Sequence, residues 1–223
     1  MDTWRDINKA LSGVAEDVGR SLVQVTNGHR GAGAGIIWNT DGLLITNAHV
    51  VRRHSPKVIL ADGQTVSSRI LAVDPDNDLA ALEIDAGNLT PASHGSSRGL
   101  KAGQWVMAMG HPWGITGSLT SGIVVGVGSG LPGMPSDREL VAVSLHLRPG
   151  YSGGPLVDAQ GRVVGVNTMM AGPEVGLAVP VHVVEDFLSA LAEHTAGRQP
   201  EQSPMAAQPV ANHGRTRWRG LWR

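Results

Sequence analysis

The stretch Gly150-Tyr151-Ser152-Gly153-Gly154-Pro155 stands between two apolar runs, residues 140–145 and 155–157, and it is the most informative part of the chain. Glycine adopts the backbone conformations that tight turns require, so we expect these residues to present Ser152 on a sharp turn. Such a turn would leave the backbone N–H groups of Gly150 and Ser152 free to converge on one point. Ser-Gly-Gly-Pro also occurs as an ordinary turn between strands, and the stretch alone leaves both interpretations open.

Outward from this turn, short apolar runs separated by Gly, Pro, Asn or Asp recur along the chain. Short strands at regular spacing, without long helices between them, are typical of closed antiparallel barrels rather than of a parallel sheet with crossover helices. A dozen strands suffice for two barrels, so we predict an all-β fold. The predicted strands are residues 22–25, 35–38, 43–46, 57–60, 65–70, 80–84, 105–109, 119–127, 140–145, 155–157, 163–167 and 176–179.

The composition agrees with this fold and limits the chemistry. The chain has 223 residues with 41% apolar content, enough to bury a substantial core, and its 30 glycines and 13 prolines favour turns over helices. It has no cysteine, which excludes disulfides, thiolate metal sites and cysteine-based catalysis. Any nucleophile must therefore be an oxygen or an amine.

The predicted domain organisation has three parts. Residues 1–20 place Ile7, Leu11, Val14 and Val18 at helical spacing, so we expect an N-terminal amphipathic helix. Residues 21–194 form the globular domain, with barrel one at about 21–95, a polar junction near 93–103, barrel two at about 100–182 and a closing helix at 183–194. Residues 195–223 lack apolar periodicity and are predicted to be a disordered basic tail.

No basic start followed by an apolar run stands at the N-terminus, and no apolar run approaches the roughly 20 residues of a membrane-spanning helix. We therefore expect a cytoplasmic protein, although a start further upstream would restore an export signal. Arginines and tryptophans at 215–223 are compatible with contact to anionic lipid or nucleic acid. An inert tail is the favoured interpretation, and no membrane or nucleic-acid partner is expected.

His49 and Asp78 each lie at the edge of a predicted strand. His49 follows the run 43–46, and Asp78 stands just before the run 80–84, where burial against a histidine is possible. A buried structural histidine is the alternative interpretation of His49. Together with Ser152, these residues complete the set that nucleophilic catalysis needs: a nucleophile, a base and an acid that orients the base.

Four blocks of the sequence carry a resemblance to a known family: GAGAGIIWNTDGLLITNAHVV, DNDLAALEI, AMGHPWGITGSLTSGIVVGVG and GYSGGPLVDAQGRVVGVNT. In order and spacing they resemble the protease domain of the HtrA (Deg) family of trypsin-like serine peptidases, over roughly residues 18–187. The resemblance implies two perpendicular β-barrels with the active site between them, and peptide-bond hydrolysis without a metal or cofactor.

Matched residue by residue, the resemblance assigns the nucleophile to Ser152, the general base to His49 and the orienting acid to Asp78. It assigns the oxyanion-hole N–H groups to Gly150 and Ser152. The family also implies that the Thr168 hydroxyl bonds Asp78 or that its main chain pairs with a substrate strand.

The chain departs from the family pattern just before the serine. Tyr151 and Arg148 replace small polar residues, and their bulk bears on whether the Gly150 N–H points into the oxyanion hole. This keeps open a rival function, a catalytically inactive peptide-binding or scaffolding protein on the same fold. After the closing helix too few residues remain for the family's peptide-binding PDZ domain, so we expect substrate capture without a PDZ groove.

Specificity and partners are less constrained. No acid precedes Ser152 to hold a basic substrate residue, whereas Leu145, Leu147, Met169 and Met170 could line an apolar pocket. We expect cleavage after small or medium aliphatic residues of unfolded or damaged proteins. The resemblance also implies a homotrimer built through N-terminal contacts, with Trp4 as a candidate.

Three other sites are disfavoured. The glycine-rich residues 28–35 lack the spacing of a phosphate-binding loop and are interpreted as a bulged turn. Asp74, Asp76 and Asp78 imitate the start of a calcium loop, but Leu79 stands where that loop needs glycine. The histidines do not have the spacing of a zinc helix, so no metal is expected.

Overall fold

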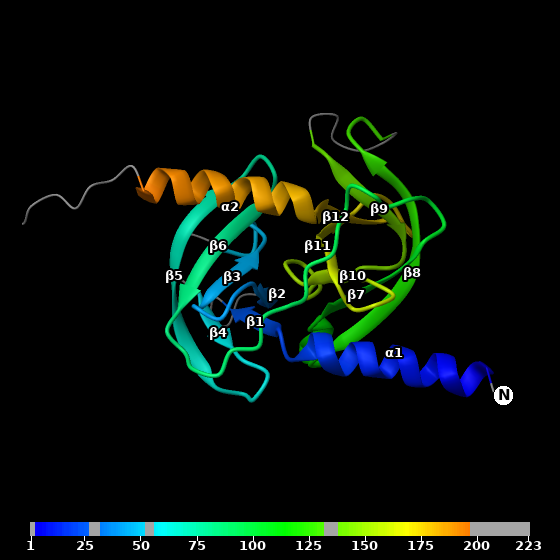
Figure 1. Ribbon diagram of the computed structural model, residues 1–223, viewed down its shortest axis with the longest axis horizontal. Helices are drawn as coiled ribbons and strands as arrows, with labels where there is room; N and C mark the ends of the chain where they lie inside the picture. The colour runs from blue at the N-terminus through cyan, green and yellow to red at the C-terminus, as the bar shows by residue number, and fades with distance from the viewer. Residues whose placement is uncertain (1–2, 27–31, 52–55, 132–137, 197–223) are drawn as a thin grey trace, which may run out of the picture.

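The computed structural model describes residues 3–26, 32–51, 56–131 and 138–196, and these form two closed antiparallel barrels (Figure 1). The first barrel has the strand order β1-β2-β3-β6-β5-β4, and the second has β10-β11-β12-β9-β8-β7. The predicted all-β fold class is confirmed. The strands of the first barrel are β1 Leu22–Thr26, β2 Ala32–Ile37, β3 Leu43–Thr46, β4 Lys57–Ile59, β5 Thr65–Asp74 and β6 Leu79–Ile84; those of the second are β7 Trp105–Gly110, β8 Ser118–Gly128, β9 Leu140–Ser144, β10 Pro155–Asp158, β11 Val163–Met170 and β12 Gly176–Pro180.

Two strands run three or more residues beyond their predicted ends, and both contain a bulge. The predicted strands end at residues 70 and 167, whereas β5 continues to Asp74 and β11 to Met170. The pairing register shifts between Ile70 and Ala72 in β5 and between Asn167 and Met169 in β11. A bulge interrupts the alternation of inward and outward side chains, so the pattern is lost where the strand continues.

The two barrels share one hydrophobic core at their junction. Leu79 and Ala81 of the first barrel belong to the same buried cluster as Met107, Met109 and Val179 of the second. Fully burying one large aliphatic side chain contributes about 1.5–3 kcal/mol, so a cluster of this size resists separation of the barrels. The shared core therefore fixes the position of one barrel relative to the other where they meet.

A helix lies on each side of this pair of barrels (Figure 1). Helix α2, Val181–Ala196, buries Val181 and Val184 and packs Leu188 and Leu191 against the shared core, in agreement with the predicted closing helix. Helix α1, Thr3–Gly19, buries Val18 and packs Leu11 and Val14 on the core.

The predicted apolar stripe of α1 is only partly covered. Trp4 is 76% exposed and Ile7 is 41% exposed, so the first half of the helix lacks a cover within the described residues. Within the described residues, neither α1 nor α2 is long and apolar enough to cross a membrane.

Two sequence expectations fall partly outside the described residues. The bulged turn expected over residues 28–35 is wrong for its second half, because β2 begins at Ala32; residues 28–31 are not described. The predicted tail continues α2 for its first two residues, because that helix ends at Ala196, and 197–223 lie outside the description. The polar junction near 93–103 is attached to the second barrel, since the N–H of Gly95 donates to the carbonyl of Val163.

Candidate active site

His49 and Asp78 are brought together by the pairing of β3 with β6. His49 comes three residues after the last residue of β3, and Asp78 comes directly before the first residue of β6. The strands are antiparallel and place Thr46 opposite Ala80. In such a pair the end of one strand lies beside the start of the next, so the two side chains meet at the same edge of the barrel.

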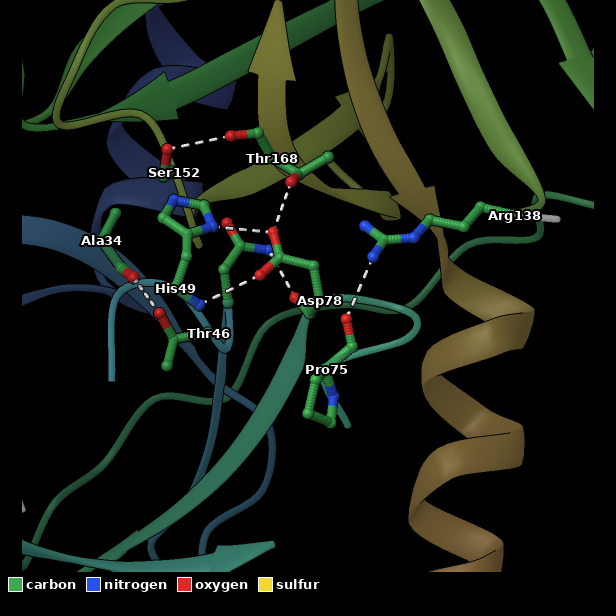
Figure 2. Close-up of polar contacts among 9 residues, drawn as sticks. Ala34, Thr46, His49, Pro75, Asp78, Arg138, Ser152 and Thr168 are labelled. Atoms are coloured by element: carbon green, nitrogen blue, oxygen red, sulfur yellow. Dashed lines mark hydrogen bonds and ion pairs between the residues drawn. The ribbon is translucent and has the colours of Figure 1, made fainter. Parts of the chain in front are cut away.

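The carboxylate of Asp78 holds the histidine at two points (Figure 2). Its Oδ2 lies 2.8 Å from His49 Nδ1, and its Oδ1 accepts the backbone N–H of His49 at 3.0 Å. The Asp78 side chain is 8% exposed and that of His49 is 48% exposed. A proton on Nδ1 donates to the carboxylate, which leaves Nε2 as the proton acceptor of the ring.

Asp78 has an unusual backbone conformation. Its φ of 55° lies in the left-handed region, which Asp tolerates better than most residues. The Asn47 side chain donates to its carbonyl at 2.9 Å, and the preceding turn is closed by Asp74, whose Oδ1 accepts the N–H of Asn77 at 3.0 Å. From the second barrel, Arg138 donates to the Pro75 carbonyl at 3.1 Å. The acid is thus fixed from both barrels.

Thr168 connects the acid to the serine, and it does so because it lies at the bulge of β11. Its hydroxyl donates to Asp78 Oδ2 at 2.5 Å, and its main-chain carbonyl accepts the Ser152 hydroxyl at 3.0 Å (Figure 2). Of the two alternatives that the resemblance implies for Thr168, the structure contains the hydroxyl contact with Asp78, whereas main-chain pairing with a substrate strand stays a prediction. A bulge re-aims a side chain that regular pairing would point elsewhere.

The protonation of Asp78 follows from these contacts. Burial by itself raises the pKa of this carboxyl group, but the hydrogen bonds from the His49 ring, the Thr168 hydroxyl and the His49 N–H, with the charge of His49, lower it. The net result is a pKa below the ordinary value of an aspartate. Asp78 is therefore a carboxylate at neutral pH, as an acceptor for the imidazole must be.

Ser152 lies on the turn that precedes β10 of barrel two, and this turn contacts barrel one. It is half-buried, and its carbonyl accepts the N–H of Ala34 in β2 at 2.8 Å. Figure 2 shows the ring of His49 between Asp78 and Ser152. The serine hydroxyl is directed to Thr168 rather than to the histidine, so it approaches the histidine only after rotation about the Cα–Cβ bond.

Gly150 forms the turn before the serine. The N–H of Tyr151 donates to the Arg148 carbonyl at 3.0 Å, and Gly150 has a φ of 110°. Proline at the second position and a positive φ at the third are the features of a type II turn. A Cβ on Gly150 would lie 2.6 Å from the His111 carbonyl oxygen, so only glycine fits. Within the described residues, no hydrogen bond uses the N–H of Gly150 or of Ser152.

Arg148 and Tyr151, the two departures from the family pattern, are the first and last residues of this turn, and neither side chain occupies it. Tyr151 is 5% exposed and packs in the core of the second barrel, where its Cα comes within 2.6 Å of the position of a Cβ on Gly110. Arg148 is exposed, and its guanidinium carbon lies 4.8 Å from the centre of the Trp113 ring. Burial raises the pKa of the Tyr151 phenol more than the nearby charge of Arg148 lowers it. The phenol is therefore uncharged at neutral pH.

The expected specificity residues divide into two groups. Leu145 and Leu147 are buried, at 4% and 6% exposure, and pack against Gly176 in the core of the second barrel. Met169 is 39% exposed at the edge of β11, and the sulfur of Met170 accepts the N–H of Leu147 at 3.1 Å. Leu147 and Met170 are thus in contact, whereas the side chain of Met169 faces solvent.

Four supporting residues were not assigned by the sequence: Asn47, Gly110, Trp113 and Arg138. Asn47 stands within the block around His49, but an asparagine beside a strand end has many uses. Gly110 leaves room for the backbone of Tyr151, which a Cβ at position 110 would meet. Arg138 donates a hydrogen bond to a turn of the other barrel. Pairs of this kind join residues far apart in the chain, so no local pattern identifies them.

Two six-stranded antiparallel barrels that bring a histidine, an aspartate and a serine together at their junction are the architecture of the trypsin-like peptidases. Residues 33–166 match the family model for the trypsin-like peptidase domain, so the chain belongs to that family.

Its relatives are HtrA- and Deg-type proteases. The chain is 36% identical to the putative serine protease HhoB of Synechocystis sp. over 163 residues, which are 70% of this chain and 39% of that protein. It is 36% identical to Protease Do-like 1 of the Arabidopsis thaliana chloroplast over 174 residues, 73% of this chain and 39% of that one. The solved structure of the HtrA-type protease AlgW with a tripeptide matches with a TM-score of 0.76 and 29% identity, covering 82% of this chain and 64% of that one. The chain therefore spans well under half the length of these two curated relatives.

Proposed function

We propose that the protein is a serine endopeptidase in which Ser152 is the nucleophile, His49 the general base and acid, and Asp78 the acid that orients His49. The N–H groups of Gly150 and Ser152 form the oxyanion hole. The observation that carries this proposal is the continuous chain of hydrogen bonds from Thr168 through Asp78 to His49, with Ser152 on the adjacent turn.

The chemistry then proceeds in two stages. Ser152 rotates from the Thr168 carbonyl to His49 and attacks the scissile carbonyl carbon, and its proton moves to Nε2 of His49. The oxyanion accepts hydrogen bonds from Gly150 and Ser152. When the C–N bond breaks, His49 returns the proton to the leaving amine, and an acyl-enzyme remains on Ser152. Water then attacks this ester as His49 takes its proton. The bond between the acyl carbon and Ser152 breaks, His49 returns the proton to Ser152, and the second product is released.

The substrate strand binds along β11. This strand pairs with β10 only through Val163–Val166, so the edge from Thr168 to Met170 has no strand partner on that side within the described residues. Such an edge binds an extended peptide through main-chain hydrogen bonds. We propose that unfolded or damaged proteins bind there, with Leu147, Met169 and Met170 beside the residue before the scissile bond, and that cleavage follows small or medium aliphatic residues. Preferential cleavage after Arg or Lys in a peptide library would contradict this specificity.

The test is labelling by a fluorophosphonate probe, run with casein degradation. We expect the wild type to be labelled and to degrade casein, and both signals to be lost in Ser152→Ala. Ser144→Ala, which removes an exposed serine at the end of β9, is the matched control and should retain both. Folded wild-type protein that neither reacts nor degrades casein would support the rival function, an inactive peptide-binding scaffold.

Assembly and compartment stay predictions. The exposed Trp4 and Ile7 on the projecting half of α1 (Figure 1) support the expected homotrimer through N-terminal contacts. Sedimentation velocity of the wild type and of Trp4→Ala tests it; a monomeric wild type would contradict it. The expected cytoplasmic location also stays a prediction, since the relatives include a chloroplast protein and a probable periplasmic serine endoprotease of Halomonas elongata.

A further inference from the structure

Trp113 is an exposed tryptophan with an unusual backbone. Its φ is 54°, which is an outlier for a large side chain, and the residue is 72% exposed. The turn around it is closed by backbone hydrogen bonds from Gly114 to His111 at 3.2 Å and from Ile115 to Pro112 at 2.9 Å. Strain of this kind costs about 1–3 kcal/mol and is retained mostly where it serves a function.

The segment that carries Trp113 supports the Gly150 turn directly. The N–H of His111 donates to the Gly150 carbonyl at 2.9 Å, and Pro112 lies 2.7 Å from the position of a Cβ on Gly150. Trp113 therefore lies beside the oxyanion turn. The peptide before the scissile bond is assigned to the β11 edge, so the peptide after it leaves Ser152 on the side of this turn.

Arg148 supplies a positive charge at the same place. Its guanidinium carbon lies over the Trp113 ring, and no carboxylate within the described residues forms an ion pair with it. The attraction between the cation and the ring uses none of the oxygen acceptors that a guanidinium binds, so its N–H donors can still bind a carboxylate with two parallel hydrogen bonds. Trp113 thus holds the cation in place without neutralising it.

From this geometry we propose that Arg148 and Trp113 form a subsite for an acidic side chain at the first or second position after the scissile bond. The inference rests on the proposed peptidase activity. Arg148 is the specificity-determining residue, and Trp113 is the residue that positions it.

The test compares peptides that differ only by Glu or Gln at these two positions, because the side chains have nearly the same shape and differ in charge. For the wild type we expect kcat/KM to be about fivefold higher with Glu, the size of an exposed, well-oriented charge pair. The preference should fall in 0.5 M salt.

The preference for Glu should disappear in Arg148→Ala and shrink in Trp113→Ala. In Arg148→Glu, Lys should be preferred over Glu. Arg98→Glu, an equal change of charge at an exposed residue between the barrels, should leave the wild-type preference.

Equal rates for Glu and Gln in the wild type, or a preference for Glu that persists in Arg148→Glu, would overturn the subsite. Labelling of Ser152 by the fluorophosphonate probe separates this result from failure of the proposed function. Where labelling is absent, the same peptides are compared by equilibrium binding to Ser152→Ala, and equal affinity for Glu and Gln would again overturn the subsite.

Discussion

The two barrels build their halves of the candidate site by different means. In the first barrel, His49 and Asp78 are fixed by side-chain hydrogen bonds, with Asn47 as a further donor. In the second, the turn before Ser152 is fixed by backbone conformation, with Gly150 against the backbone of His111 and Pro112. We therefore expect that changing one polar atom in the first barrel's half of the site lowers kcat. In the second barrel's half, we expect that adding one carbon lowers kcat.

The largest effect is expected in the first barrel, from Asp78→Asn. The amide keeps the shape but favours the other tautomer of His49, and such a change costs about 10⁴-fold in kcat in a trypsin-like enzyme. Steady-state kinetics on a peptide substrate measures it. Asp76→Asn, an exposed neighbour in the same turn, is the control and should stay near wild type. Activity of Asp78→Asn within tenfold of wild type would show that Asp78 does not orient the histidine.

The second barrel is tested by Gly150→Ala. The new Cβ meets the His111 carbonyl and moves the Gly150 N–H, so we expect a loss of about 10²–10³ in kcat, the value of one oxyanion donor. Gly103→Ala is the control: it places alanine at a similar positive φ of 89°, but the added Cβ has no neighbouring atom within 4 Å. It therefore reports the effect of backbone strain without a steric clash. Equal kinetics for the two variants would remove Gly150 from the oxyanion hole.

Thr168→Val tests the connection between the barrels and should have the smallest effect. Its hydroxyl lowers the pKa of Asp78, and a hydrogen bond to a charged group contributes about 1.5–3 kcal/mol. A lowered carboxyl pKa stabilises the fold above the unfolded-state pKa, near 3.8, and this contribution is lost as pH falls through the folded-state pKa. Urea unfolding should therefore show a deficit for Thr168→Val at pH 7 that shrinks below pH 4.

The control for this experiment is Thr120→Val, in β8 of the same barrel. It should show no deficit that depends on pH in this range. A constant deficit for Thr168→Val across the range would mean that the hydroxyl acts through packing and not through the charge of Asp78.

Prediction from sequence succeeded where the pattern is local. The spacing of the apolar runs predicted both barrels. The roles assigned to Ser152, His49 and Asp78, which stand near the ends of such runs, stay predictions. It failed at the bulges: the run 163–167 ended before Thr168, since a bulge removes the alternation that marks a strand. The concern that Tyr151 would crowd the turn is answered by Gly110, forty-one residues earlier, beside which the ring is buried.

The sequence by itself determined the two-barrel class, the candidate nucleophile, base and acid, and the glycine of the turn, because each depends on neighbours within a few residues. Only the tertiary structure decided that Thr168 contacts both Asp78 and Ser152, that Arg138 supports the acid from the other barrel, and that Arg148 rests on Trp113. These contacts join residues that strand pairing and barrel closure bring together from distant parts of the chain. Their geometry is a property of the packed fold, which no local pattern encodes.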